Sequence, residues 1–190
     1  MNDRLDLPAS NLNLLDLLIA SVREKGLLSE AYSINKVAEP LAGTEPPDPP
    51  WKLLVLIVDA ALTSADFRAK VFQPGFPVEI GKIGYMSDVD LRYAIAGGFQ
   101  DASMVADYIG NYCDLPGNAD VLDFGCGTLR VSRYLIQFAK GYTYHACDVN
   151  PFSMEWARNE FGNLANVFVM KSSPPLGLGE QSIDFAVAWS

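Results

Sequence analysis

After residue 115 the sequence alternates between short apolar strands and helical segments, and this alternation is the feature that most limits the fold. Six elements follow one another: strands at 120–124, 142–147, 166–170 and 183–189, with helices at 128–140 and 151–161. Strands that alternate with helices form a parallel sheet with helices packed on its faces. The sequence therefore predicts an α/β sandwich for residues 116–190.

A glycine-rich loop follows the first predicted strand. Asp123 lies near the end of this strand, Gly125 and Gly127 come next, and a helix is predicted after them. Glycine permits sharp turns and the close approach of a ligand, and the start of a helix presents unpaired N–H groups. In open parallel sheets, ligands bind beyond the carboxyl ends of the strands. The loop is therefore predicted to be a nucleotide-type cofactor site.

The dinucleotides NAD and FAD are one class of cofactor that such a loop can bind. Their loops have the pattern Gly-x-Gly-x-x-Gly, in which the third glycine allows close packing of helix on strand and the helix N-terminus faces a pyrophosphate. Arg130 stands at the position of that third glycine. The large side chain disfavours a dinucleotide.

The loop resembles that of the class I, Rossmann-like methyltransferases, which use S-adenosylmethionine. In this family an acidic residue stands two places before the first glycine, as Asp123 does here. Asp148 follows Gly127 by 21 residues and matches the family's acid that accepts hydrogen bonds from both ribose hydroxyls. A carboxylate suits a diol because its two oxygens can only accept hydrogen bonds, and each ribose hydroxyl can donate one. An NAD enzyme would show the same acid, so Asp148 alone does not discriminate.

Other segments extend the resemblance over about residues 120–190. Residues 172–176 resemble the family's loop after strand three, and residues 182–190 resemble its strand four. More loosely, residues 81–107 resemble the lead-in helices of bacterial methyltransferases that are often linked to glycan and secondary-metabolite pathways. The resemblance implies a Rossmann-like three-layer sandwich with a parallel sheet, preceded by a helical N-terminal region.

The resemblance also implies which residues hold S-adenosylmethionine. Asp123 and the loop backbone would hold the methionine part, Asp148 the ribose, and Val149 would flank the adenine. Lys171 and Ser172 would border the adenine edge. The complete implied set is Asp123, Phe124, Gly125, Cys126, Gly127, Asp148, Val149, Lys171 and Ser172. No residue is nominated as a catalytic base.

Structural roles remain alternatives for both acids. Asp123 also suits a cap on the following turn or helix, and Asp148 followed by Asn150 and Pro151 also suits a turn before a helix. The chain departs from the family at Leu129, where a third glycine is usual, and near residue 172, where a polar or acidic residue is usual.

Four other reactive side chains are predicted to serve the structure. Cys126 is expected to be a small loop residue, because methyl transfer needs no covalent enzyme intermediate. His145 lies inside a predicted strand and Asp184 begins another, so both are expected to be structural. Arg130 is expected to be a surface or ion-pairing residue.

Two regions precede the predicted sheet. Residues 1–50 combine an amphipathic helix at 10–25 with a proline-rich linker, and residues 51–115 form a helical lead-in. Within the lead-in, Gly97–Gly98 is predicted to end one helix, and a second helix is predicted from Asp101. That second helix carries a stripe predicted to pack in the core: Met104, Val105, Tyr108, Ile109 and Tyr112.

Composition excludes several classes of function. The formal net charge of −9 disfavours nucleic acid as a partner, because Lys and Arg supply affinity for phosphate backbones. Three cysteines without CxxC spacing and a single histidine suggest neither a disulfide framework nor a zinc site. With no disulfide framework suggested, a reducing, cytoplasmic location is expected. No apolar run approaches the about 20 residues of a membrane span, so no membrane segment is expected.

The sequence thus predicts an S-adenosylmethionine-dependent methyltransferase that acts on a small-molecule or glycan acceptor. The family usually has seven strands in the order 3-2-1-4-5-7-6, so the resemblance implies a chain truncated after strand four, with that strand at an open edge. The alternatives are a non-catalytic fragment or interaction module, and an NAD-dependent oxidoreductase that Arg130 disfavours. Oligomeric state is not predicted.

Overall fold

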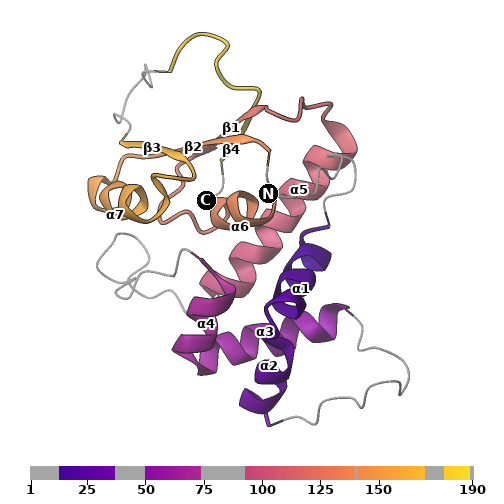
Figure 1. Ribbon diagram of the computed structural model, residues 1–190. Coiled ribbons are helices and arrows are strands. Elements are labelled where there is room, and N and C mark those ends of the chain that lie inside the picture. Colours follow the sequence, from indigo (N-terminus) through magenta and orange to yellow (C-terminus); the bar gives the residue numbers. More distant parts are fainter. Residues whose placement is uncertain (1–12, 37–49, 74–92, 140, 170–177, 189–190) are drawn as a thin grey trace, which may run out of the picture.

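A computed structural model describes residues 13–36, 50–73, 93–139, 141–169 and 178–188. They form a group of helices and a four-stranded sheet (Figure 1). The elements are α1 (Leu14–Glu24), α2 (Leu28–Ile34), α3 (Pro50–Thr63), α4 (Ala65–Val71), the π-helical turn η3 (Tyr93–Gly97), α5 (Gly98–Tyr112), β1 (Asp120–Phe124), α6 (Ser132–Phe138), β2 (Thr143–Asp148), α7 (Pro151–Phe161), β3 (Asn166–Val169) and β4 (Phe185–Ala188). None of the described helices is long and apolar enough to cross a membrane.

The four strands are parallel and lie in the order β3-β2-β1-β4. Leu122 of β1 pairs with His145 of β2 on one side and with Ala186 of β4 on the other. The helices α6 and α7 lie on the same side of the sheet (Figure 1). The Rossmann-like α/β fold predicted from the sequence is therefore confirmed, including the helices that precede the sheet.

Among the described residues, a hydrophobic core joins the sheet to the preceding helices. Tyr134 of α6 lies fully buried at this junction. Its ring meets Phe72 and Phe99 edge-on, with centroids 5.8 and 5.4 Å away. Its hydroxyl donates a hydrogen bond of 2.8 Å to the carbonyl of Ile95 in η3. This bond ties the π-helical turn η3 to the helix α6 that packs on the sheet.

The prediction for Gly97–Gly98 was wrong, because the chain stays helical from η3 through α5. A Cβ on Gly98 would lie 2.4 Å from the carbonyl oxygen of Arg130, which no side chain tolerates. Gly98 therefore allows α5 to approach the loop after β1, and it does not end a helix. The predicted start of the earlier helix, near residue 87, lies outside the described residues.

Two predicted helix starts were also wrong. The helix after β1 begins at Ser132 instead of Thr128, because Leu129 has a φ of +54° that cannot continue an α-helix. The first helix begins at Leu14, where Asn13 accepts hydrogen bonds from two backbone N–H groups. By contrast, α7 begins at Pro151 as predicted.

The stripe on α5 is only partly buried. Val105 and Ile109 lie in the core, whereas Met104, Tyr108 and Tyr112 are exposed. The helical spacing identified an apolar face correctly, but the face is wider than the surface that the core contacts. The prediction of core packing was thus wrong for these three residues.

We predict that Tyr134→Phe destabilises the fold by about 1–2 kcal/mol, because the buried carbonyl of Ile95 loses its hydrogen bond while the ring packing remains. Urea denaturation followed by circular dichroism measures the effect. Tyr112→Phe is the matched control, since Tyr112 is 77% exposed, and it should change stability by less than about 0.5 kcal/mol. Equal effects of the two variants would contradict the prediction.

Candidate functional site

The loop after β1 turns sharply across the end of β2. Gly125 and Gly127 have φ values of +75° and +53°, which glycine adopts without strain. The N–H groups of Gly125 and Cys126 both donate to the carbonyl of Cys147, over 2.8 and 3.1 Å. These two bonds hold the loop against the carboxyl end of the neighbouring strand.

Asp148 joins the loop from the end of β2. One carboxylate oxygen accepts the N–H of Gly127 at 2.9 Å, and the other accepts the N–H of Asn150 at 2.8 Å. The bond to Asn150 forms the turn that the sequence offered as an alternative role for this acid. The bond to Gly127 brings together two residues predicted to share a cofactor site.

Asp123 is buried beneath the loop, with 4% of its surface exposed. The hydroxyl and the backbone N–H of Ser132 donate to its carboxylate, so Asp123 caps the start of α6. Burial raises the pKa of Asp123 to about 6, although Ser132 and Arg130 act in the opposite direction. The capping role that the sequence left open is therefore present, and the carboxylate faces the helix.

Ser132 is one residue of this arrangement that sequence reasoning missed. It stands nine residues after Asp123, in the first turn of the helix that the loop leads into. Ser132 is the first residue of α6, and its hydroxyl donates to Asp123 instead of accepting a helix N–H as a capping serine does. The predicted helix start at Thr128 placed Ser132 inside the helix and gave no reason to select it.

Apolar side chains lie exposed at the same end of the sheet. Phe124 at the end of β1 is 38% exposed, and Val149 just after β2 is 46% exposed. Phe152 in the first turn of α7 is more exposed still and was not predicted as a site residue. Lys171 and Ser172, the remaining predicted contacts, lie outside the described residues.

Cys126 has no features of a nucleophile. It is buried, and its Sγ lies 3.9 Å from the sulfur of Met154. Burial and the nearby carboxylates raise the pKa of its thiol, so the reactive thiolate is disfavoured. This agrees with its predicted role as a loop residue. Among the described residues, no group of three His, Cys, Asp or Glu side chains could hold a metal ion.

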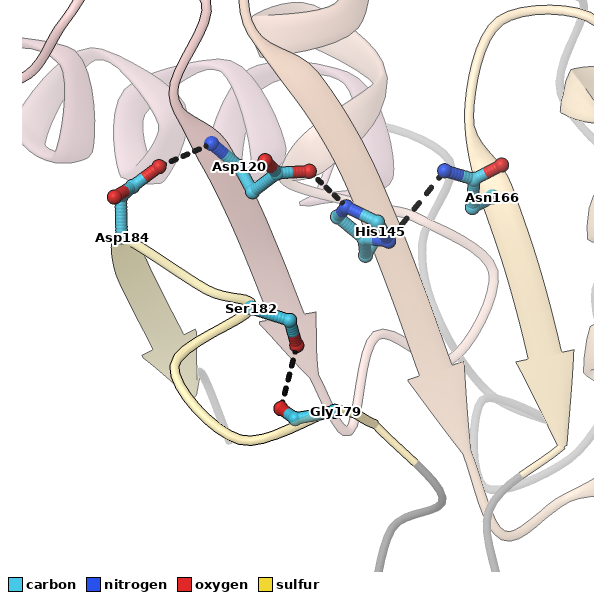
Figure 2. Close-up of polar contacts among 6 residues, drawn as sticks. All are labelled: Asp120, His145, Asn166, Gly179, Ser182 and Asp184. Carbon is cyan, nitrogen blue, oxygen red and sulfur yellow. Dashed lines mark hydrogen bonds and ion pairs between the residues drawn. The ribbon is translucent and has the colours of Figure 1, made fainter.

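A second polar cluster lies at the opposite, amino end of the strands (Figure 2). His145 Nε2 lies 2.6 Å from Asp120 Oδ1, and Nδ1 of the same ring lies 3.5 Å from the amide nitrogen of Asn166. The carboxylate of Asp184 accepts the N–H of Asp120 at 2.8 Å. These contacts link β1, β2 and β3 with the residue directly before β4, which agrees with the structural roles predicted for His145 and Asp184.

Comparison with known proteins finds distant structural similarity only. No family model and no curated protein matches the chain. The crystal structure of the DszA carbon methyltransferase is 12% identical, with a TM-score of 0.41, over 92% of this chain and 62% of that one. Coclaurine N-methyltransferase, bound to N-methylheliamine and SAH, is 16% identical, with a TM-score of 0.35, over 85% of this chain and 49% of that one.

The chain therefore spans less than two thirds of either structure. The assignment of the fold rests on the sheet itself, whose parallel strands lie in the order β3-β2-β1-β4. The fold is Rossmann-like. What the site binds is a separate question that depends on its own chemistry.

The raised pKa of Asp123 predicts a pH-dependent effect. The folded state binds this proton more tightly than the unfolded chain, so the contribution of Asp123 to stability falls as pH rises through its folded pKa, about 6. Asp123→Asn stays neutral and keeps an oxygen for Ser132. The free energy of unfolding of the variant, relative to that of the wild type, should therefore rise by about 3 kcal/mol between about pH 4 and pH 7. Above that range the difference should stay constant.

Urea denaturation of both proteins at a series of pH values measures this difference, because groups common to both proteins cancel. A difference that stays constant from pH 4 to pH 7 would show that burial does not raise this pKa.

Proposed function

We propose that this chain binds S-adenosylmethionine and supplies the cofactor-binding part of a methyltransferase. The observation that carries the proposal is the position of Asp148, whose carboxylate lies 2.9 Å from the N–H of Gly127 at the carboxyl end of the sheet. This places a two-oxygen acceptor directly beside a glycine loop. A ribose diol is the group that such an acceptor suits.

The space in front of the loop also fits a ligand. A Cβ built on Gly125 or on Gly127 would meet no atom within 4 Å, so the backbone faces open space there. Phe124 and Val149 are exposed beside it and offer apolar surface to a flat base. The residues present therefore fit the nucleoside portion of the cofactor.

Electrostatics favour S-adenosylmethionine over a dinucleotide. Asp123 and Asp148 interact with each other electrostatically, which shows that two acids lie near the loop. The nearby Arg130 is ion-paired with Asp101, which offsets part of its charge. Such a site repels a pyrophosphate and attracts the positively charged sulfonium and ammonium groups of S-adenosylmethionine.

Each part of the site has a proposed task. Asp148 accepts the ribose hydroxyls, the loop backbone lies along the methionine part, and Val149 flanks the adenine. Asp123 supports the loop from below through Ser132 and does not contact the methionine part directly. Lys171 and Ser172 remain proposed contacts at the adenine edge. The cofactor would supply a methyl group on sulfur, and the protein aligns it with the acceptor.

The proposed acceptor is a small molecule or a glycan. The net charge of −9 disfavours a nucleic acid, because a phosphate backbone would be repelled. No described residue is nominated as the base that takes the acceptor's proton. A screen for methyl transfer separates this proposal from a non-catalytic module: turnover supports an enzyme, and cofactor binding without turnover supports the module.

The proposal predicts that S-adenosylhomocysteine binds and that Asp148→Ala weakens this binding by at least about tenfold, because two hydroxyl contacts are lost. Isothermal titration calorimetry measures the affinity. Asp107→Ala is the control, since Asp107 is an exposed acid on α5 away from the loop, and its affinity should equal that of the wild type. Failure of the wild type to bind at near-millimolar ligand would rule out the proposed cofactor.

A further inference from the structure

The cofactor loop is contacted by helix α5, which lies before the sheet in the sequence. Arg130, at the end of the loop, forms an ion pair with Asp101 of α5. The two side chains are 11% and 18% exposed, so the pair is largely shielded from water. Removing one partner of such a pair costs more stability than removing one partner of a surface pair, because the remaining charge is poorly solvated.

The backbone of α5 contacts the same residue. Gly98 lies one helical turn before Asp101, and a Cβ there would lie 2.4 Å from the carbonyl oxygen of Arg130 and 3.0 Å from its Cγ. Residues three apart in a helix share a face. Gly98 and Asp101 thus meet Arg130 together, one through close backbone packing and the other through charge.

The neighbouring residue explains why the loop needs this support. Leu129 has a φ of +54°, a left-handed conformation that disfavours a side chain with a Cβ. Gly125 and Gly127 adopt similar angles without strain, but Leu129 does not. A strained residue persists only where its surroundings over-determine it. Leu129 is fully buried, and the contacts of α5 fix the residue directly after it.

We propose that α5 acts as a clamp on the cofactor loop, with Asp101 as a positioning residue for the proposed cofactor site. Through Arg130 the clamp keeps Leu129 left-handed and so sets the position of the Gly127 N–H beside Asp148. The inference rests on the proposed function for its ligand, but the clamp itself is a property of the ligand-free chain.

Amide hydrogen exchange of the full chain without ligand tests the clamp. In Asp101→Asn, which keeps the shape and removes the charge, exchange of the Gly127 and Leu129 amides should accelerate about tenfold. The β1 amides of Val121 and Leu122 should exchange at the wild-type rate. Glu30→Gln is the matched control, because it breaks the more exposed ion pair with Lys70 and should leave the loop unchanged.

Binding of S-adenosylhomocysteine gives the second readout. Asp101→Asn should weaken it about tenfold, and Asp101→Glu, which restores the charge, should recover most of the loss. If Asp101→Asn does not fold, Arg130→Lys replaces it, since a lysine keeps the charge without the paired geometry of the guanidinium.

The outcomes separate the two proposals. Unchanged loop exchange, or acceleration spread equally over the sheet, would overturn the clamp, because the second pattern indicates only a loss of global stability. Faster exchange confined to the loop supports the clamp even if the wild type binds no S-adenosylhomocysteine. Such a lack of binding would refute the proposed cofactor but not the clamp.

Discussion

The contact between the buried carboxylate of Asp123 and Ser132 is the interaction on which the candidate site depends. It joins the end of the central strand to the first residue of α6, so the intervening loop is fixed at both ends. The cost of burying the acid appears in its raised pKa. Two donors from one serine offset part of that cost, and the loop between these residues is left free to face a ligand. Asp148 then accepts the N–H of Gly127 within this loop.

The two ends of the sheet differ in how their polar groups are satisfied. At the amino end, Asp120, His145 and Asp184 bond to one another across neighbouring strands (Figure 2). At the carboxyl end, the loop presents glycine backbone, the carboxylate of Asp148 and exposed apolar side chains. A parallel sheet has this asymmetry because its strands all end on the same side. The cluster around His145 is therefore part of the scaffold, and the proposed ligand site lies at the other end.

Local patterns in the sequence predicted the local features of the fold. The alternation of strands and helices, the start of α7 at Pro151 and the glycine loop all depend on neighbouring residues, and all are present. Two helix starts were misplaced for local reasons, and the other errors concern contacts between distant residues. From the sequence alone Gly98 is typical of a helix end, whereas in the structure it allows close packing against Arg130. Asp101 pairs with the same arginine, which is 29 residues away in the sequence. Similarly, Tyr134 contacts η3 across 39 residues. The local periodicity of a sequence indicates that a helix or strand has an apolar face, but not which distant segment packs against that face.

Arg130 shows how one substitution in a familiar pattern is accommodated. In a dinucleotide-binding loop, a glycine at this position lets the helix begin close to the strand and aim its N–H groups at a pyrophosphate. Here α6 begins two residues later, and the arginine turns toward Asp101 of α5. The loop thereby gains a contact with a helix outside the sheet. The same change that disfavours a dinucleotide is compatible with the proposed cofactor, which has no pyrophosphate to bind.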